Sequence, residues 1–126
     1  PDSPPYFDKD QWTDKPARFF VTEIIREKIL LYYDKEVPYA TEVMVESFKE
    51  GEHAIHIRAV IFVERESQKG IIIGHGGAAL KKVSTEARKT LEKFFGKSIY
   101  LEVFVKVDKD WRQNEKRLET YGYKLD

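Results

Sequence analysis

The sequence predicts an α+β domain of two layers, in which a three-stranded mixed sheet carries helices on one face. Three observations support this fold class. Apolar residues follow a helical spacing in residues 15–33 and 78–95, and they alternate as in strands in residues 43–48, 55–63 and 98–107. Glycine-containing turns separate several of these segments. The chain has 126 residues, of which 41% are apolar and 35% charged, so it can form one globular domain with a real core.

The N-terminal residues 1–12 are rich in proline and aspartate and are expected to form an extended linker, with the domain occupying residues 13–126. Thr13 is a candidate N-cap and Pro16 suits a first helical turn, so the first helix is expected from about Lys15 to Tyr33. Its predicted apolar face consists of Phe20, Val21, Ile24, Ile25, Leu31 and Tyr32.

Two strand patterns follow this helix. Residues 43–48 and 55–63 alternate in polarity, and the short polar turn of residues 49–52 joins them. A turn of this length predicts an antiparallel hairpin, and the second strand is apolar enough to be the central strand of the sheet.

The second half of the chain completes the layers. A short helix after Arg65 leads to a glycine-rich turn, and a long helix is expected over residues 78–95, with Gly96 ending it. The strand of residues 98–107 should pair in parallel with the central strand, because a helical crossover connects the two. A final amphipathic helix is expected over about residues 109–120.

The glycine-rich turn is the main candidate functional motif. Gly74, Gly76 and Gly77 fall within four positions immediately before the predicted long helix. Glycine permits positive φ and the close approach of another backbone, and the N-terminus of a helix attracts anions. The Gly-x-x-Gly spacing is the loop with which KH domains clamp single-stranded RNA, although a corner between helices that merely needs glycine explains the tetrapeptide equally well.

Local charge favours a phosphate ligand. The whole chain has 22 basic and 22 acidic residues, so its net charge neither favours nor excludes binding to nucleic acid. Residues 65–97 contain eight basic and three acidic residues, which gives a net charge of +5 around the glycine turn.

The order of elements, together with local sequence, resembles the C-terminal KH domain of the bacterial Era GTPases. The residues that carry the resemblance are 22–28, 63–69, 73–77, 86–89, 105–107 and Trp111. It covers about residues 6–123 and implies a type II KH fold with a C-terminal helix, attached in the parent protein to a GTPase domain. It further implies binding to single-stranded RNA at the 3′ end of small-subunit (16S) ribosomal RNA during ribosome assembly.

Two features depart from that family. The sequence contains no Gly-x-x-x-x-Gly-Lys-Ser/Thr phosphate loop, so this chain is expected to be no enzyme and to need no cofactor. Gly76 stands where the family usually has a lysine or another polar residue. The candidate RNA-binding residues are Arg65, Lys69, Ile73, Gly74, His75, Gly76, Gly77, Lys81 and Lys82.

Other functions find less support in the sequence. There is no cysteine, and neither a catalytic constellation nor a metal-ligand spacing is present, since His53 and His56 should lie on opposite strand faces. No apolar run is long enough to span a membrane; the resemblance leaves room for peripheral membrane contact. We expect a cytoplasmic monomer whose partners are the small ribosomal subunit and the GTPase domain of the parent protein.

The alternative function is that of a protein-interaction or regulatory domain that contacts the GTPase domain or ribosomal proteins. It rests on the sheet face opposite the predicted helix layer, where several apolar residues should be exposed unless another segment covers them. These residues are Met44, Phe48, Val60, Phe62, Tyr100 and Phe104.

Overall fold

The computed structural model of the chain describes residues 9–34 and 36–109. Its elements are α1 (Lys9–Tyr32), α2 (Glu36–Tyr39), β1 (Thr41–Glu50), β2 (Ala54–Val63), α3 (Glu66–Ile73), the 3₁₀ turn η1 (His75–Gly77), α4 (Ala78–Phe95) and β3 (Ser98–Val107). The order of the predicted elements is confirmed over this range, and the predicted helix of residues 109–120 lies outside it apart from Lys109.

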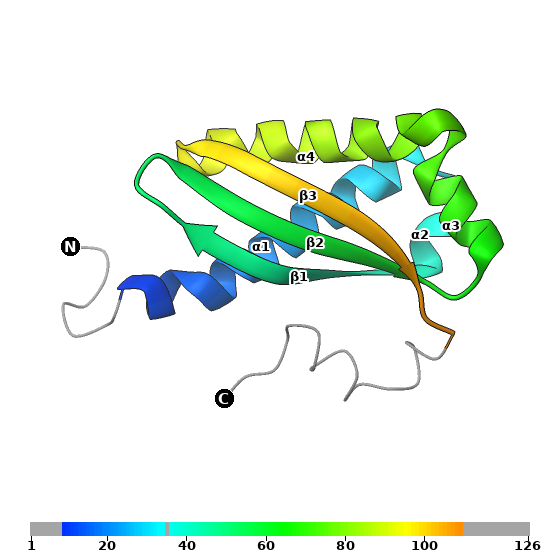
Figure 1. Cartoon of the computed structure of the whole chain (residues 1–126), viewed down its shortest axis with the longest axis horizontal. Coiled ribbons are helices and arrows are strands. Elements are labelled where there is room, and N and C mark those ends of the chain that lie inside the picture. Colours follow the sequence, from blue (N-terminus) through cyan, green and yellow to red (C-terminus); the bar gives the residue numbers. More distant parts are fainter. Residues whose placement is uncertain (1–8, 35, 110–126) are drawn as a thin grey trace.

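The three strands form one mixed sheet in the order β1-β2-β3 (Figure 1). The hairpin strands β1 and β2 pair antiparallel, and β2 pairs in parallel with β3 from Ala54↔Ser98 to Val63↔Val107. The crossover from β2 to β3 runs through α3 and α4, which explains the parallel pairing. The α+β class and the mixed sheet with helices on one face are thus confirmed.

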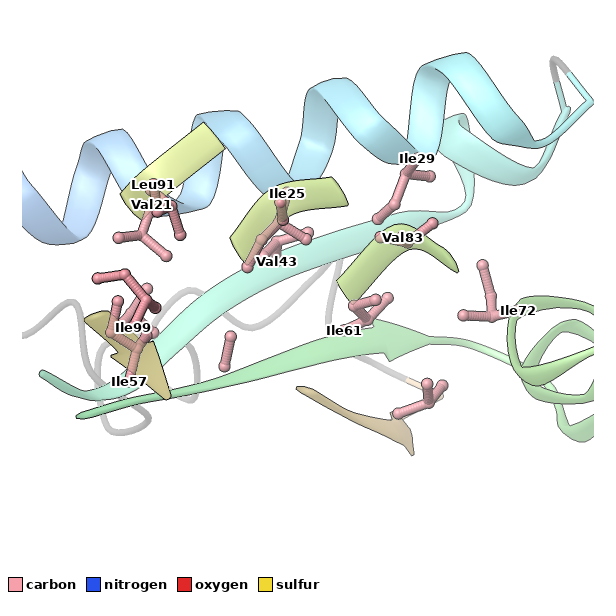
Figure 2. Close-up of a cluster of buried hydrophobic side chains, with 14 of the residues drawn as sticks. Val21, Ile25, Ile29, Val43, Ile57, Ile61, Ile72, Val83, Leu91 and Ile99 are labelled. Atoms are coloured by element: carbon pink, nitrogen blue, oxygen red, sulfur yellow. The ribbon is translucent and has the colours of Figure 1, made fainter. Parts of the chain in front are cut away.

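The core fills the space between the sheet and the two long helices (Figure 2). Val21, Ile25 and Ile29 recur along α1 at four-residue spacing and are all buried. Helix α4 contributes Val83, Ala87 and Leu91 at the same spacing, and inward-facing residues of all three strands complete the cluster.

Helix α1 differs from its prediction at both ends. It begins at Lys9, so Pro16 lies inside the helix, and residues 9–12 of the expected linker are helical. The sequence pattern predicts Leu31 and Tyr32 on the apolar face, but they are 64% and 38% exposed. Ile29 is buried instead, because it continues the four-residue spacing from Val21 and Ile25.

The hairpin contains a β-bulge that the alternation does not reveal. Val45 pairs with Ala59 but Ser47 pairs with Arg58, so Glu46 is an extra residue in β1. The bulge moves Phe48 opposite Ile57 and onto the helix-covered core, where the sequence pattern had placed it on the other face.

The remaining apolar residues of that other face are not equally exposed. Met44, Val60 and Phe62 are at most 1% exposed, whereas Tyr100 and Phe104 on β3 are 58% and 41% exposed. The predicted apolar surface therefore reduces to two aromatic residues on β3.

Candidate nucleic-acid interface

The glycine turn is a sharp reversal between α3 and α4. Gly74 has φ 78° and ψ 178°, Gly76 has φ 62°, and Gly77 has φ 80°. Across the described part of the chain, no residue other than glycine adopts a positive φ. All three positions therefore favour glycine, because other L-residues are strained in these conformations.

The three glycines differ in the space around them. A Cβ atom added at Gly74 would lie 2.6 Å from the Cβ of Ala79 and 3.0 Å from its nitrogen. A Cβ atom added at Gly76 or at Gly77 would have no other atom within 4 Å. Gly74 therefore serves the packing of the turn against α4, while Gly76 and Gly77 leave a bare backbone surface that a ligand can approach.

Two backbone amides of the turn have no acceptor among the described residues. Those of Gly74, Gly77 and Ala78 donate to the carbonyls of Gly70, Gly74 and His75. Within the described residues, the amides of His75 and Gly76 make no hydrogen bond. They lie at the N-terminus of the 18-residue helix α4, whose dipole adds a partial positive charge. The turn can thus donate hydrogen bonds to an oxyanion such as a phosphate.

Ion pairs sort the basic residues of this region into two groups. Arg88, Lys89 and Lys97 lie 3.1, 3.7 and 2.8 Å from carboxylate oxygens of Glu92, Glu86 and Glu50, respectively. Across the part of the chain that the structure covers, no carboxylate lies within ion-pair distance of the other five, which are Arg65, Lys69, Lys81, Lys82 and Lys93. Four of these five are predicted site residues, so uncompensated positive charge is concentrated on α3 and the first turns of α4.

The two lysines at the start of α4 project to different sides. The Lys82 ammonium lies 4.5 Å from the centre of the Tyr32 ring at the end of α1, in a cation–π contact. Lys81 shares a side of α4 with Glu92, eleven positions later, and Glu92 accepts a hydrogen bond from the backbone N–H of Ile99 on β3. The pair therefore flanks the turn, with Lys82 toward α1 and Lys81 toward β3.

Arg65 lies further from the turn than the two lysines at the start of α4. Arg65 precedes α3 and is exposed, and a helix of eight residues places it roughly 12 Å from Gly74. It borders a shallow depression with Glu64 and Lys109. Lys109 was not among the predicted residues. A strand held at the turn reaches Arg65 only by running along α3.

The three consecutive isoleucines of α3 have different environments. Ile72 is fully buried, Ile73 is half-buried and packs on the core, and Ile71 is 53% exposed. The predicted contact residue Ile73 is therefore less accessible than Ile71, which helical spacing turns outward.

Among residues 9–34 and 36–109, no group of three or more His, Asp or Glu side chains is arranged to hold a metal ion. His53 is exposed beside Glu52, and the ring of His56 stacks on Tyr100 at a centroid distance of 4.7 Å. None of the described helices combines the length and hydropathy required to cross a bilayer.

Comparison with known proteins identifies the family. A model of the KH domain family matches residues 36–112. The chain is 52% identical over 125 residues to the GTPase Era of Syntrophus aciditrophicus, and the match covers 98% of this chain and 41% of that protein. The chain thus spans about two fifths of the length of this curated relative.

Solved structures give the same result at the level of the fold. A structure of Aquifex aeolicus Era bound to GDP and aluminium fluoride has 38% sequence identity and a TM-score of 0.77, with coverage of 99% of this chain and 42% of that chain. A structure of Era in complex with nucleotides 1506-1542 of 16S ribosomal RNA has 37% identity, the same TM-score and the same coverage. These likenesses confirm the resemblance to Era proteins, and this chain belongs to the KH domain family.

Proposed function

We propose that this chain is an RNA-binding module that grips single-stranded RNA and performs no chemistry of its own. The observation that carries the proposal is a pair of amides, those of His75 and Gly76, which are free within the described part of the chain. They lie at the N-terminus of α4 near lysines that have no carboxylate partner in that part. A phosphate placed there would accept two backbone hydrogen bonds and meet Lys81 or Lys82 within one helical turn. KH loops of this type clamp about four nucleotides of a single strand.

We further propose the 3′ end of 16S ribosomal RNA as the target, and assembly of the small ribosomal subunit as the setting. The Era structure with bound 16S nucleotides supports this choice, since its sequence is 37% identical across nearly the whole chain. In this proposal the module acts as a cytoplasmic monomer and is attached to a GTPase domain in the parent protein. The sequence itself contains no phosphate-loop motif, which supports a binding role without hydrolysis.

A protein-interaction role is the second candidate. It is favoured by Tyr100 and Phe104, two aromatic residues exposed on the sheet face away from α1 and α4. The rings contact His56 and Arg58, and Arg58 also lies 3.4 Å from Glu102. This surface is of mixed charge, so it suits a protein better than a polyanion.

The test uses one loop position and two nearly isosteric side chains. Gly77 has φ 80° and ψ 7°, a conformation that Asn and Asp tolerate better than other residues, and its surroundings are open. We expect Gly77→Asp to weaken binding of a labelled single-stranded RNA roughly tenfold or more, because a carboxylate would face the phosphate. Gly77→Asn should bind much more tightly than Gly77→Asp.

The RNA for this titration is the single-stranded 3′ segment of 16S ribosomal RNA, and the same sequence in a duplex is the comparison. Circular dichroism checks that both variants remain folded. Equal binding of Gly77→Asp and Gly77→Asn, or equal affinity for the single strand and the duplex, would refute the clamp. Gly74 is unsuitable for this test because any side chain there collides with Ala79.

A further inference from the structure

A hydrogen bond joins the end of α1 to the last turn of α3. The hydroxyl of Tyr33 donates to the carbonyl oxygen of Ile72 over 2.5 Å, between residues 39 positions apart. Tyr33 follows the last residue of α1, and its ring packs against the core. Figure 1 shows this end of α1 approaching α3 and the start of α4.

The acceptor lies at a place where helices lack partners. The last carbonyls of an α-helix have no intrahelical donor, and buried ones need a donor from elsewhere. In α3 the Gly70 carbonyl receives the amide of Gly74, and the Ile72 carbonyl receives the Tyr33 hydroxyl. Ile72 is itself fully buried at the α3 end of the core (Figure 2). The end of α3 is therefore held in two ways, by the hydrogen bond to the Ile72 carbonyl and by the burial of the Ile72 side chain in the core.

The hydrogen bond from Tyr33 to Ile72 lies two residues before the glycine turn. Gly74 leaves α3 with a backbone conformation that only glycine adopts readily, and the free amides of His75 and Gly76 follow directly. Any rotation of the last turn of α3 would therefore change the direction of those amides. Burial raises the pKa of Tyr33 to about 12, so its hydroxyl remains protonated and able to donate at neutral pH.

We propose that Tyr33 is a positioning residue for RNA binding, whose hydroxyl holds the end of α3 so that the turn presents its free amides to a phosphate. This inference rests on the proposed RNA-binding function and names a residue outside the Gly-x-x-Gly motif. Tyr33 touches no RNA in this account. It acts through Ile72 and the backbone that follows.

The neighbouring residue supplies a matched control. Tyr32 is also at the end of α1, but its hydroxyl makes no hydrogen bond with any described residue, and its ring contacts Lys82. Tyr33→Phe and Tyr32→Phe therefore remove the same atom from adjacent positions. Both variants keep the ring, so core packing and the cation–π contact are retained.

The experiment compares both variants with the unchanged chain in three measurements. These are the Kd for the single-stranded 3′ segment of 16S ribosomal RNA, the dependence of that Kd on salt, and amide hydrogen exchange at Gly74 and Gly77. For Tyr33→Phe we expect binding to weaken about three- to tenfold and exchange at both amides to accelerate, since the turn is held less firmly. The salt slope should not change, because no phosphate contact is lost. Tyr32→Phe should change none of the three.

Each alternative outcome has a distinct meaning. If Tyr33→Phe lowers the unfolding free energy but leaves RNA affinity and both loop amides unchanged, the hydroxyl is merely structural and the proposal is wrong. A smaller salt slope would also overturn it, since it would show the loss of a phosphate contact. If the unchanged chain binds no RNA, the proposed function fails, while the exchange rates at Gly74 and Gly77 still decide whether Tyr33 positions the turn.

Discussion

At the scale of single residues, Gly76 is the loop position best suited to a gain of function. Its surroundings are open, since a Cβ atom added there would meet no other atom within 4 Å. We expect Gly76→Lys to tighten binding to single-stranded RNA and to steepen the log–log salt slope by about 0.7, the value for one more phosphate contact. The gain should be similar for many RNA sequences, because phosphate contacts position a strand without reading its bases.

The same substitution carries a conformational cost. Gly76 has φ 62° and ψ 20°, and a side chain in this left-handed region costs roughly 1–2 kcal/mol of stability. Gly76→Gln is the control, since it imposes the same backbone strain without a charge. Chemical denaturation and RNA titration on both variants separate the two effects. Weaker binding of Gly76→Lys than of Gly76→Gln would show that no phosphate lies near this position.

At the same scale, some features of the glycine turn could be predicted from the sequence and others depend on the folded structure. The spacing Gly74-x-x-Gly77 predicted the turn correctly. The sequence could not distinguish Gly74 from Gly77, because that difference depends on where the Cβ of Ala79 lies after folding. Tyr33 was missed for the same reason, since its acceptor is 39 positions away and no local pattern connects them.

At the scale of elements, α4 and β3 were predicted to the residue, while α1 and β1 were not. Helix α4 ends at Gly96, whose φ of 70° and ψ of 24° form a left-handed cap, and this is a local signal that the sequence displays. The bulge at Glu46 depends on pairing with β2, so the alternation of β1 alone placed Phe48 on the wrong face. Helix α1 starts before Pro16, because proline marks a first turn only by preference.

The junction between α3 and α4 gives a prediction at this scale. Gly74→Ala should disrupt the junction, because its Cβ would collide with Ala79 and the backbone conformation at Gly74 is essentially restricted to glycine. We expect a loss of about 2–3 kcal/mol in unfolding free energy, together with weaker RNA binding. The measurement is urea denaturation followed by circular dichroism, with RNA titration on the folded variant.

Gly76→Ala is the matched control for the junction. It also places a methyl group at a positive φ, but in open space, so roughly 1–2 kcal/mol of strain is expected without a collision. Equal losses at the two positions would show that close packing of α3 on α4 does not depend on Gly74. Such a result would remove the distinction between a packing glycine and ligand-facing glycines.

At the scale of the whole molecule, positive and negative charges are equal in number but unevenly distributed over the structure. The chain has equal numbers of basic and acidic residues, so long-range attraction to RNA cannot come from its net charge. Four basic residues that have no carboxylate partner among the described residues, Arg65, Lys69, Lys81 and Lys82, lie at the α3–α4 end, while the hairpin between β1 and β2 lies at the opposite end of the sheet (Figure 1). This arrangement predicts that the position of a lysine, and not its contribution to net charge, decides RNA affinity.

Three substitutions of equal charge test that prediction: Lys81→Ala, Lys93→Ala and Lys49→Ala. Lys81 lies about 6 Å along α4 from Gly77, whereas Lys93 lies about 24 Å away, more than two Debye lengths at physiological salt. Lys49 is exposed near the hairpin end of β1. Lys81→Ala should weaken binding and lower the salt slope by about 0.7, and the other two should leave both quantities unchanged. Equal effects at all three positions would indicate diffuse attraction of RNA, and the docking of a strand at the glycine turn would be excluded.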